Sequence, residues 1–133
     1  MKLLGLLALL FSFSSIASDY TDSYKQCTNN STGSIDKAFS CIDKEIEFNQ
    51  SLINEVFDTN TTNSDIGRIL KTISSNVEKE YRVASESCEI YTDIYQGGQA
   101  GQLLQRQCYL DRIIYIRKFV LDTEELTNFN YDE

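Results

Sequence analysis

The sequence predicts an all-α fold: a three-helix antiparallel bundle, up-down-up, held by two disulfides. Apolar residues recur at helical spacing over about residues 34–58, 64–94 and 101–122, and two polar interruptions separate these stretches. Proline is absent from the 133 residues, so every residue keeps the amide donor that a long helix requires. The four cysteines are even in number, as expected of a disulfide framework.

The first 18 residues are typical of a secretory signal peptide. Lys2 precedes an apolar run over residues 3–13, and small residues then provide a cleavage site at Ala17 or Ser18. The apolar run is shorter than the ~20 residues that a membrane-spanning helix needs. No second segment is long enough to span a bilayer. We therefore expect an exported protein, periplasmic or secreted.

The charge of the mature chain restricts its partners. Removing the signal, which carries one Lys and no acid, leaves eleven basic and twenty acidic residues, a net charge of −9. Nucleic acid is a poor partner, because phosphate binding relies on clustered Lys and Arg. An acidic surface suits either simple solubility or a basic protein partner. By length we expect one domain, residues 19–123, followed by an acidic flexible tail over residues 124–133.

The cysteine spacing favours two local disulfides. Cys27, Cys41, Cys88 and Cys108 all lie in the exported part, where an oxidising compartment supports disulfides. A zinc site is the alternative, but it usually needs close Cys pairs, and these separations are 14, 47 and 20 residues. Of three possible pairings we predict Cys27–Cys41 and Cys88–Cys108, since each closes a local loop. A loop of about twenty residues contributes roughly 3 kcal/mol in the chain-entropy description.

The first predicted helix follows a polar segment that ends at Gly33. Ser34 suits the N-cap, and Asp36 lies in the first turn, where a negative charge is favoured. Asn49 interrupts the apolar face and needs a hydrogen-bonding partner if it is buried. Cys41 lies beside that face, where the polar N-terminal arm can fold back and bring Cys27 to it. The face consists of Ile35, Phe39, Ile42, Ile46, Ile53 and Val56.

The second predicted helix follows a linker, residues 58–63, without apolar residues. Ser64 suits its N-cap. Its apolar stripe extends from Ile66 to Tyr91 and includes Cys88, so the sulfur of Cys88 should face the other helices.

A pair of glycines, Gly97 and Gly98, predicts the reversal between the second and third helices. Glycine tolerates positive φ and commonly ends helices. A reversal there brings Cys88 and Cys108 level on two antiparallel helices. In the third helix, the run from Tyr109 to Leu121 is apolar on more than one face. Such a helix is either central in the bundle or part of a second interface, and the second possibility predicts a homodimer.

The available side chains exclude several kinds of catalysis. The chain has no His and no Trp, and two disulfides leave no free Cys, so nucleophile–histidine pairs and histidine-ligated metals are excluded. Asp43 and Glu47, at positions i and i+4, remain a possible carboxylate pair for hydrolysis, although an exposed acidic face is far commoner. We expect no enzyme activity, no metal and no cofactor.

The order of features resembles the LprI-type lysozyme inhibitor family of exported bacterial proteins. Ile53-Asn54-Glu55-Val56-Phe57 after Cys41 is similar to the family's Leu-Asn-x-x-Tyr, and Gly97-Gly98 precedes Cys108 as in the family's Gly-Gly loop. The resemblance covers roughly residues 27–121. The chain departs from the family where Glu80 and Ala84-Ser85 replace a Trp and an Arg-Asp pair, and where Ile113 and Ile116 replace a Thr and an Arg.

The resemblance implies a small disulfide-linked helical domain of the cell envelope that binds a lysozyme-like hydrolase. Such enzymes are often basic, which fits the acidic chain. Two alternatives are a periplasmic immunity protein against an envelope-targeting toxin and a small carrier of an apolar ligand. For a protein partner, we expect the contacts at the rigid glycine reversal, through Asp93, Gln96, Gly97, Gly98 and Gln99.

Overall fold

A computed structural model describes residues 19–59 and 64–131, and every secondary-structure element within these residues is helical. The signal peptide predicted for residues 1–18 lies outside them. The elements in chain order are α1 (Asp22–Asn30), α2 (Ile35–Thr59), α3 (Ser64–Cys88), α4 (Ile90–Ile94) and α5 (Gln99–Tyr131). The all-α class is confirmed, and α2, α3 and α5 correspond to the three predicted helices. The bundle of only three helices is not confirmed, because α1 and α4 are additional.

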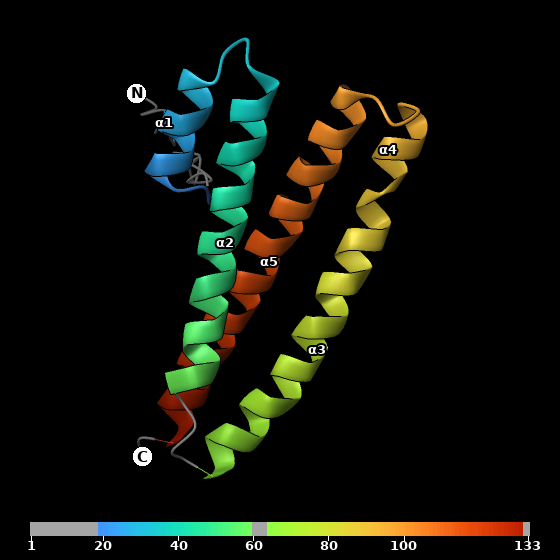
Figure 1. The fold of residues 1–133 in the computed structure, drawn as a ribbon. Coiled ribbons are helices and arrows are strands. Elements are labelled where there is room, and N and C mark those ends of the chain that lie inside the picture. The colour runs from blue at the N-terminus through green and yellow to red at the C-terminus, as the bar shows by residue number, and fades with distance from the viewer. Residues whose placement is uncertain (1–18, 60–63, 132–133) are drawn as a thin grey trace, which may run out of the picture.

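Helix α5 is the central element of the bundle. It lies between α2 on one side and α3 with α4 on the other, whereas α2 and α3 touch each other very little (Figure 1). The apolar residues of α5 therefore divide between two partners. This arrangement explains why the run from Tyr109 to Leu121 is apolar on more than one face.

The two halves of the core meet along α5. One cluster joins α2, α3 and α5 around the fully buried Ile53, Ile113 and Val120. A second cluster joins α2 and α5 around Ile42 and Leu110, and receives Tyr20 and Tyr24 from the N-terminal segment. Burial of such side chains contributes about 1.5–3 kcal/mol each. The core thus depends on α5 along most of its length.

The N-terminal segment is more ordered than a polar arm. It forms α1, whose N-cap Thr21 accepts a hydrogen bond from the amide of Tyr24. Thr21 also donates to the buried carboxylate of Glu45 on α2, from its amide at 2.8 Å and from its hydroxyl at 2.6 Å. The disulfide Cys27–Cys41 joins α1 to α2, as the sequence predicts, with 5.7 Å between the Cα atoms. Sequence spacing alone could not show the contact with Glu45.

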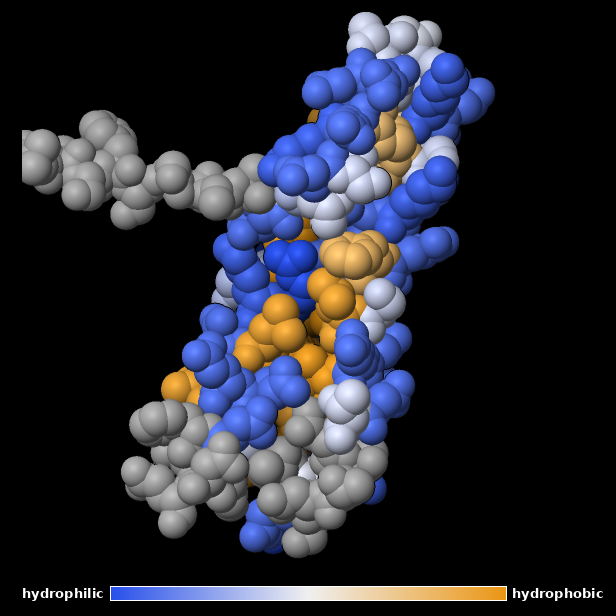
Figure 2. Space-filling view, turned by 90° about the vertical axis from the view of Figure 1, so that its left-hand side faces the viewer, coloured by the Kyte–Doolittle hydropathy of each residue, from blue (hydrophilic) through white to orange (hydrophobic). Residues whose placement is uncertain are grey.

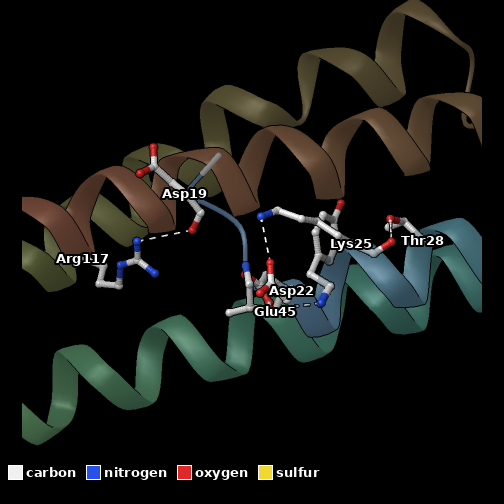
Figure 3. Close-up of polar contacts among 8 residues, drawn as sticks. Asp19, Asp22, Lys25, Thr28, Glu45 and Arg117 are labelled. Carbon is white, nitrogen blue, oxygen red and sulfur yellow. Dashed lines mark hydrogen bonds and ion pairs between the residues drawn. The ribbon is translucent and has the colours of Figure 1, made fainter. Parts of the chain in front are cut away.

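A network of polar contacts around the buried Asn49 connects α2, α5 and the segment before α1. Asn49, with no exposed surface, donates to the carbonyl of Glu45 at 2.6 Å and accepts from Arg117 at 2.7 Å. Arg117 also reaches the carbonyl of Asp19 (Figure 3). Lys118 pairs with the Asp19 carboxylate at 2.7 Å. Asn49 therefore has the partners that its burial requires.

Two helix boundaries differ from the predicted ones. The second predicted helix is interrupted at Glu89, whose amide is shared between the carbonyls of Ser85 and Glu86, so that α4 is a separate short helix. The segment expected to be a flexible tail is helical as far as Tyr131. It contains neither glycine nor proline to end α5, and Thr127 is buried. None of the described helices is long and apolar enough to cross a membrane.

Two neighbouring positions of α5 provide a test of this packing. Ile113 is fully buried between α2 and α3, whereas Tyr115 is 70% exposed. We expect Ile113→Ala to lower the free energy of unfolding by about 2–5 kcal/mol, because it removes buried surface and leaves a cavity. Tyr115→Ala should change it by less than about 0.5 kcal/mol. Urea unfolding of both oxidised variants measures this, and equal losses would contradict the central position of α5.

Candidate functional site

The reversal between α4 and α5 is held by a closed set of backbone hydrogen bonds. The amide of Gly97 donates to Thr92 at 2.8 Å, and that of Gly98 donates to Tyr95 at 3.0 Å. Gln96 and Gly97 have φ values of 52° and 75°, a conformation that glycine adopts without strain. The side chain of Gln102 donates back to the carbonyl of Gly97 at 3.0 Å. The predicted reversal is therefore present and tightly built.

Three contacts hold α4 and the end of α3 against α5. The disulfide Cys88–Cys108, the second predicted pair, joins the last residue of α3 to α5 with 5.8 Å between the Cα atoms. The hydroxyl of Thr92 lies 2.8 Å from the side-chain oxygen of Gln105. At Gly101 the helices approach so closely that an added Cβ would lie 2.7 Å from the carbonyl oxygen of Tyr91. We call the segment from Glu86 to Gln99 the tip. These contacts make the tip rigid, so binding through it would cost little conformational entropy.

All five residues predicted to contact a partner lie at the tip and are exposed: Asp93, Gln96, Gly97, Gly98 and Gln99. The fold brings them together on one reversal at the end of the bundle (Figure 1). Their role in binding stays a prediction.

Sequence reasoning missed the apolar side chains that lie beside these residues. Ile90, Ile94 and Tyr95 are exposed by 55%, 63% and 47%. Aliphatic and aromatic side chains of this size supply most of the energy at protein interfaces when they become buried. The signal was present in the sequence, because Ile90 and Ile94 fall outside the apolar stripe that ends at Tyr91.

The tip is acidic. Glu86, Glu89 and Asp93 are exposed, and no Lys or Arg occurs between Arg82 and Arg106. Exposed apolar side chains within an acidic surface suit a protein partner with a basic surface, because opposite charge steers association.

The arrangement does not resemble a catalytic or metal site. Asp43 of the predicted carboxylate pair forms an ion pair with Arg106, whose guanidinium lies 4.5 Å from the centre of the Phe39 ring. In the part of the chain that the structure describes, no group of three or more metal-ligating side chains comes together.

Two other surfaces also expose apolar side chains. Tyr115 and Phe119 line a groove of about 470 Å³ between α3 and α5. Figure 2 shows hydrophobic residues gathered over the middle of the face that it presents. Phe48 of α2, exposed by 44%, lines a groove of about 370 Å³ beside α1. Neither surface combines exposed apolar side chains with the close helix contact that makes the tip rigid.

The described residues form a small, disulfide-linked helical bundle, and the chain is acidic. A family model described as "Antitoxin TsiV3" matches residues 31–128, most of the chain and nearly all of the described bundle. The chain belongs to this antitoxin family. No curated protein and no solved structure matches it. The likeness to LprI-type inhibitors therefore holds only at the coarser level of a small helical domain with two disulfides.

The close helix contact at Gly101 generates a prediction about the tip. Gly101→Ala places a methyl group against the backbone of α4, which cannot rotate away. We expect a net loss of about 1–3 kcal/mol in unfolding free energy, despite the better helix propensity of alanine. Ala100→Leu, which adds bulk at the exposed neighbouring position, should stay within about 0.5 kcal/mol. Thermal unfolding that ranks the two variants in the opposite order would contradict this contact.

Proposed function

We propose that this protein is an exported immunity protein that neutralises a toxin acting in the cell envelope, by binding it without catalysis. The observation that carries the proposal is the antitoxin family, matched over residues 31–128. Two disulfides support a location outside the cytoplasm, and the predicted signal peptide supports the periplasm in particular. This replaces general lysozyme inhibition as the leading hypothesis.

The toxin that suits this surface is basic and acts on the cell wall. A basic toxin would be attracted to a mature chain of net charge −9 and to the acidic tip. A toxin that degrades the cell wall would also unite the immunity function with the lysozyme-inhibitor resemblance. Blocking such an enzyme requires only that a rigid protrusion cover or enter its substrate cleft. The tip has that shape and is fixed by Cys88–Cys108.

A carrier of an apolar ligand receives no comparable support. The interior between the helices is filled by side chains such as Ile53, Leu110 and Ile113, which have no exposed surface. The grooves described above lie at the surface and include charged residues in their walls.

Protection of cells is the direct test of this proposal. A candidate envelope-targeting toxin, sought first among the neighbouring genes, is exported to the periplasm of bacteria that lack the immunity protein. Co-expression of the wild-type chain with its signal peptide should restore growth, whereas the same chain without residues 1–18 should not. Killing that continues at full rate when the wild-type protein is present in the periplasm would refute the proposal.

Alanine substitutions at the tip and at the opposite end of the bundle test the role of the tip. Ile94 and Leu126 are exposed to nearly the same extent, 63% and 64%, at opposite ends of the bundle. We expect Ile94→Ala combined with Tyr95→Ala to weaken toxin binding at least tenfold, as loss of interface anchors does. Leu126→Ala should leave the Kd within about twofold. Calorimetric titration measures both, and the reverse pattern would place the interface at the other end.

A homodimer through the run from Tyr109 to Leu121 stays a separate prediction. Five of its apolar residues are buried within the bundle, but Tyr115 and Phe119 remain exposed by 70% and 52%. If a second copy covers them, sedimentation at micromolar concentration should show a dimer, and Phe119→Lys should convert it to a monomer. Ile94→Lys, at the tip, should leave the dimer intact. A monomeric wild type would end the hypothesis.

A further inference from the structure

A groove of about 430 Å³ opens where α2 and α3 diverge above α5. Its floor is formed by Gln105, Arg106 and Tyr109 of α5. Its walls are formed by Asp43, Ile46 and Glu47 of α2, and by Ser85 and Cys88 of α3. Because Gln105 also contacts Thr92 of α4, the groove is continuous with the tip.

The two ends of the groove differ in charge. Towards the start of α2, Arg106 is held by the carboxylate of Asp43 and by the ring of Phe39, so its charge is already compensated. One turn further along α2, Glu47 is exposed, and no cation of the described residues pairs with it. The groove therefore offers an uncompensated negative charge at the end that lies away from Phe39.

Apolar surface and the phenol ring of Tyr109 line the groove together with Glu47. Ile46 and Tyr109 line the groove, and Cys88, which also lines it, is fully buried. A phenol has an ordinary pKa of about 10. Burial raises the pKa of Tyr109 further, so its ring brings no charge to the groove at physiological pH.

A groove that has apolar walls and one unpaired carboxylate at one end fits a long cationic side chain. Arg and Lys bury their aliphatic stems against apolar surface while the charged head contacts an acid. A carboxylate that already has one cationic partner gains less from a second one. For this reason Glu47 is the better acceptor than Asp43.

We infer that this groove receives an arginine or lysine side chain of the toxin, with the stem against Ile46 and Tyr109 and the cationic head on Glu47. The inference rests on the proposed function and names the partner chemistry of the surface next to the tip. The tip would supply apolar contacts, and the groove would select for the cation. The protein would bind a toxin with a neutral residue at the matching position more weakly.

The test uses a charge-neutralising variant and a matched control. Glu47→Gln keeps the shape of the side chain and removes its charge, and Glu125→Gln makes the same change at an exposed position near the far end of α5. The Kd for the purified toxin is measured with the oxidised full-length mature protein at about 50 mM and about 200 mM salt. We expect Glu47→Gln to weaken binding about tenfold at low salt and less at high salt, and Glu125→Gln to change it by less than twofold.

The outcomes separate the inference from the proposed function. If the wild type binds the toxin and Glu47→Gln binds equally well at both salt concentrations, the groove does not receive the cation, although the immunity function stands. If both glutamine variants weaken binding equally, the effect is general charge steering and the inference is overturned. If the wild type does not bind, the inference and the proposed function both fail. A selective loss at Glu47 with reduced salt dependence supports the inference.

Discussion

The burial of α5 against α2 on one side and α3 on the other is the interaction on which the rest of the structure depends. Leu110, Ile113 and Val120 have no exposed surface, and α2 and α3 contribute little to each other directly. Without α5 the other helices would have no common core. The same geometry creates the proposed binding groove, because α2 and α3 can diverge above α5 only when a third helix fills the space between them.

The disulfides act at the edges of this core. Cys27–Cys41 joins the short α1, which has no buried residue, to α2. Cys88–Cys108 joins the end of α3 to α5 next to the tip. A disulfide stabilises mainly by restricting the unfolded chain, which matters most where local contacts are few. An immunity protein gains from this placement, because a protrusion that is already rigid loses little entropy when it binds.

The sequence predicted the features that local patterns determine, and it missed those that depend on distant contacts. The stripes of α2 and α3 and both cysteine pairings follow from spacing alone. Helix α1 is polar, and it depends on Thr21 reaching Glu45, 24 residues away in the chain. Ile90 and Ile94 differ from this case, because they fall outside the apolar stripe and their exposure could have been inferred from the sequence. The predicted contact residues were brought together by the reversal, but their apolar neighbours were absent from the expected site. The family resemblance identified a small helical binding protein and named the wrong family, because paired cysteines and a Gly-Gly loop describe architecture better than function.

The central claim is that the tip and the adjoining groove cover the toxin. Hydrogen–deuterium exchange of the protein alone and in complex with the toxin tests it most directly, because the method reports every segment of the chain at once. Increased protection should concentrate in residues 86–99 of the tip and in residues 43–47 and 105–109 of the groove. Residues 111–131 of α5 and residues 64–77 of α3 should change little. Protection confined to the far half of α5 or to α1, with the tip unchanged, would contradict the account.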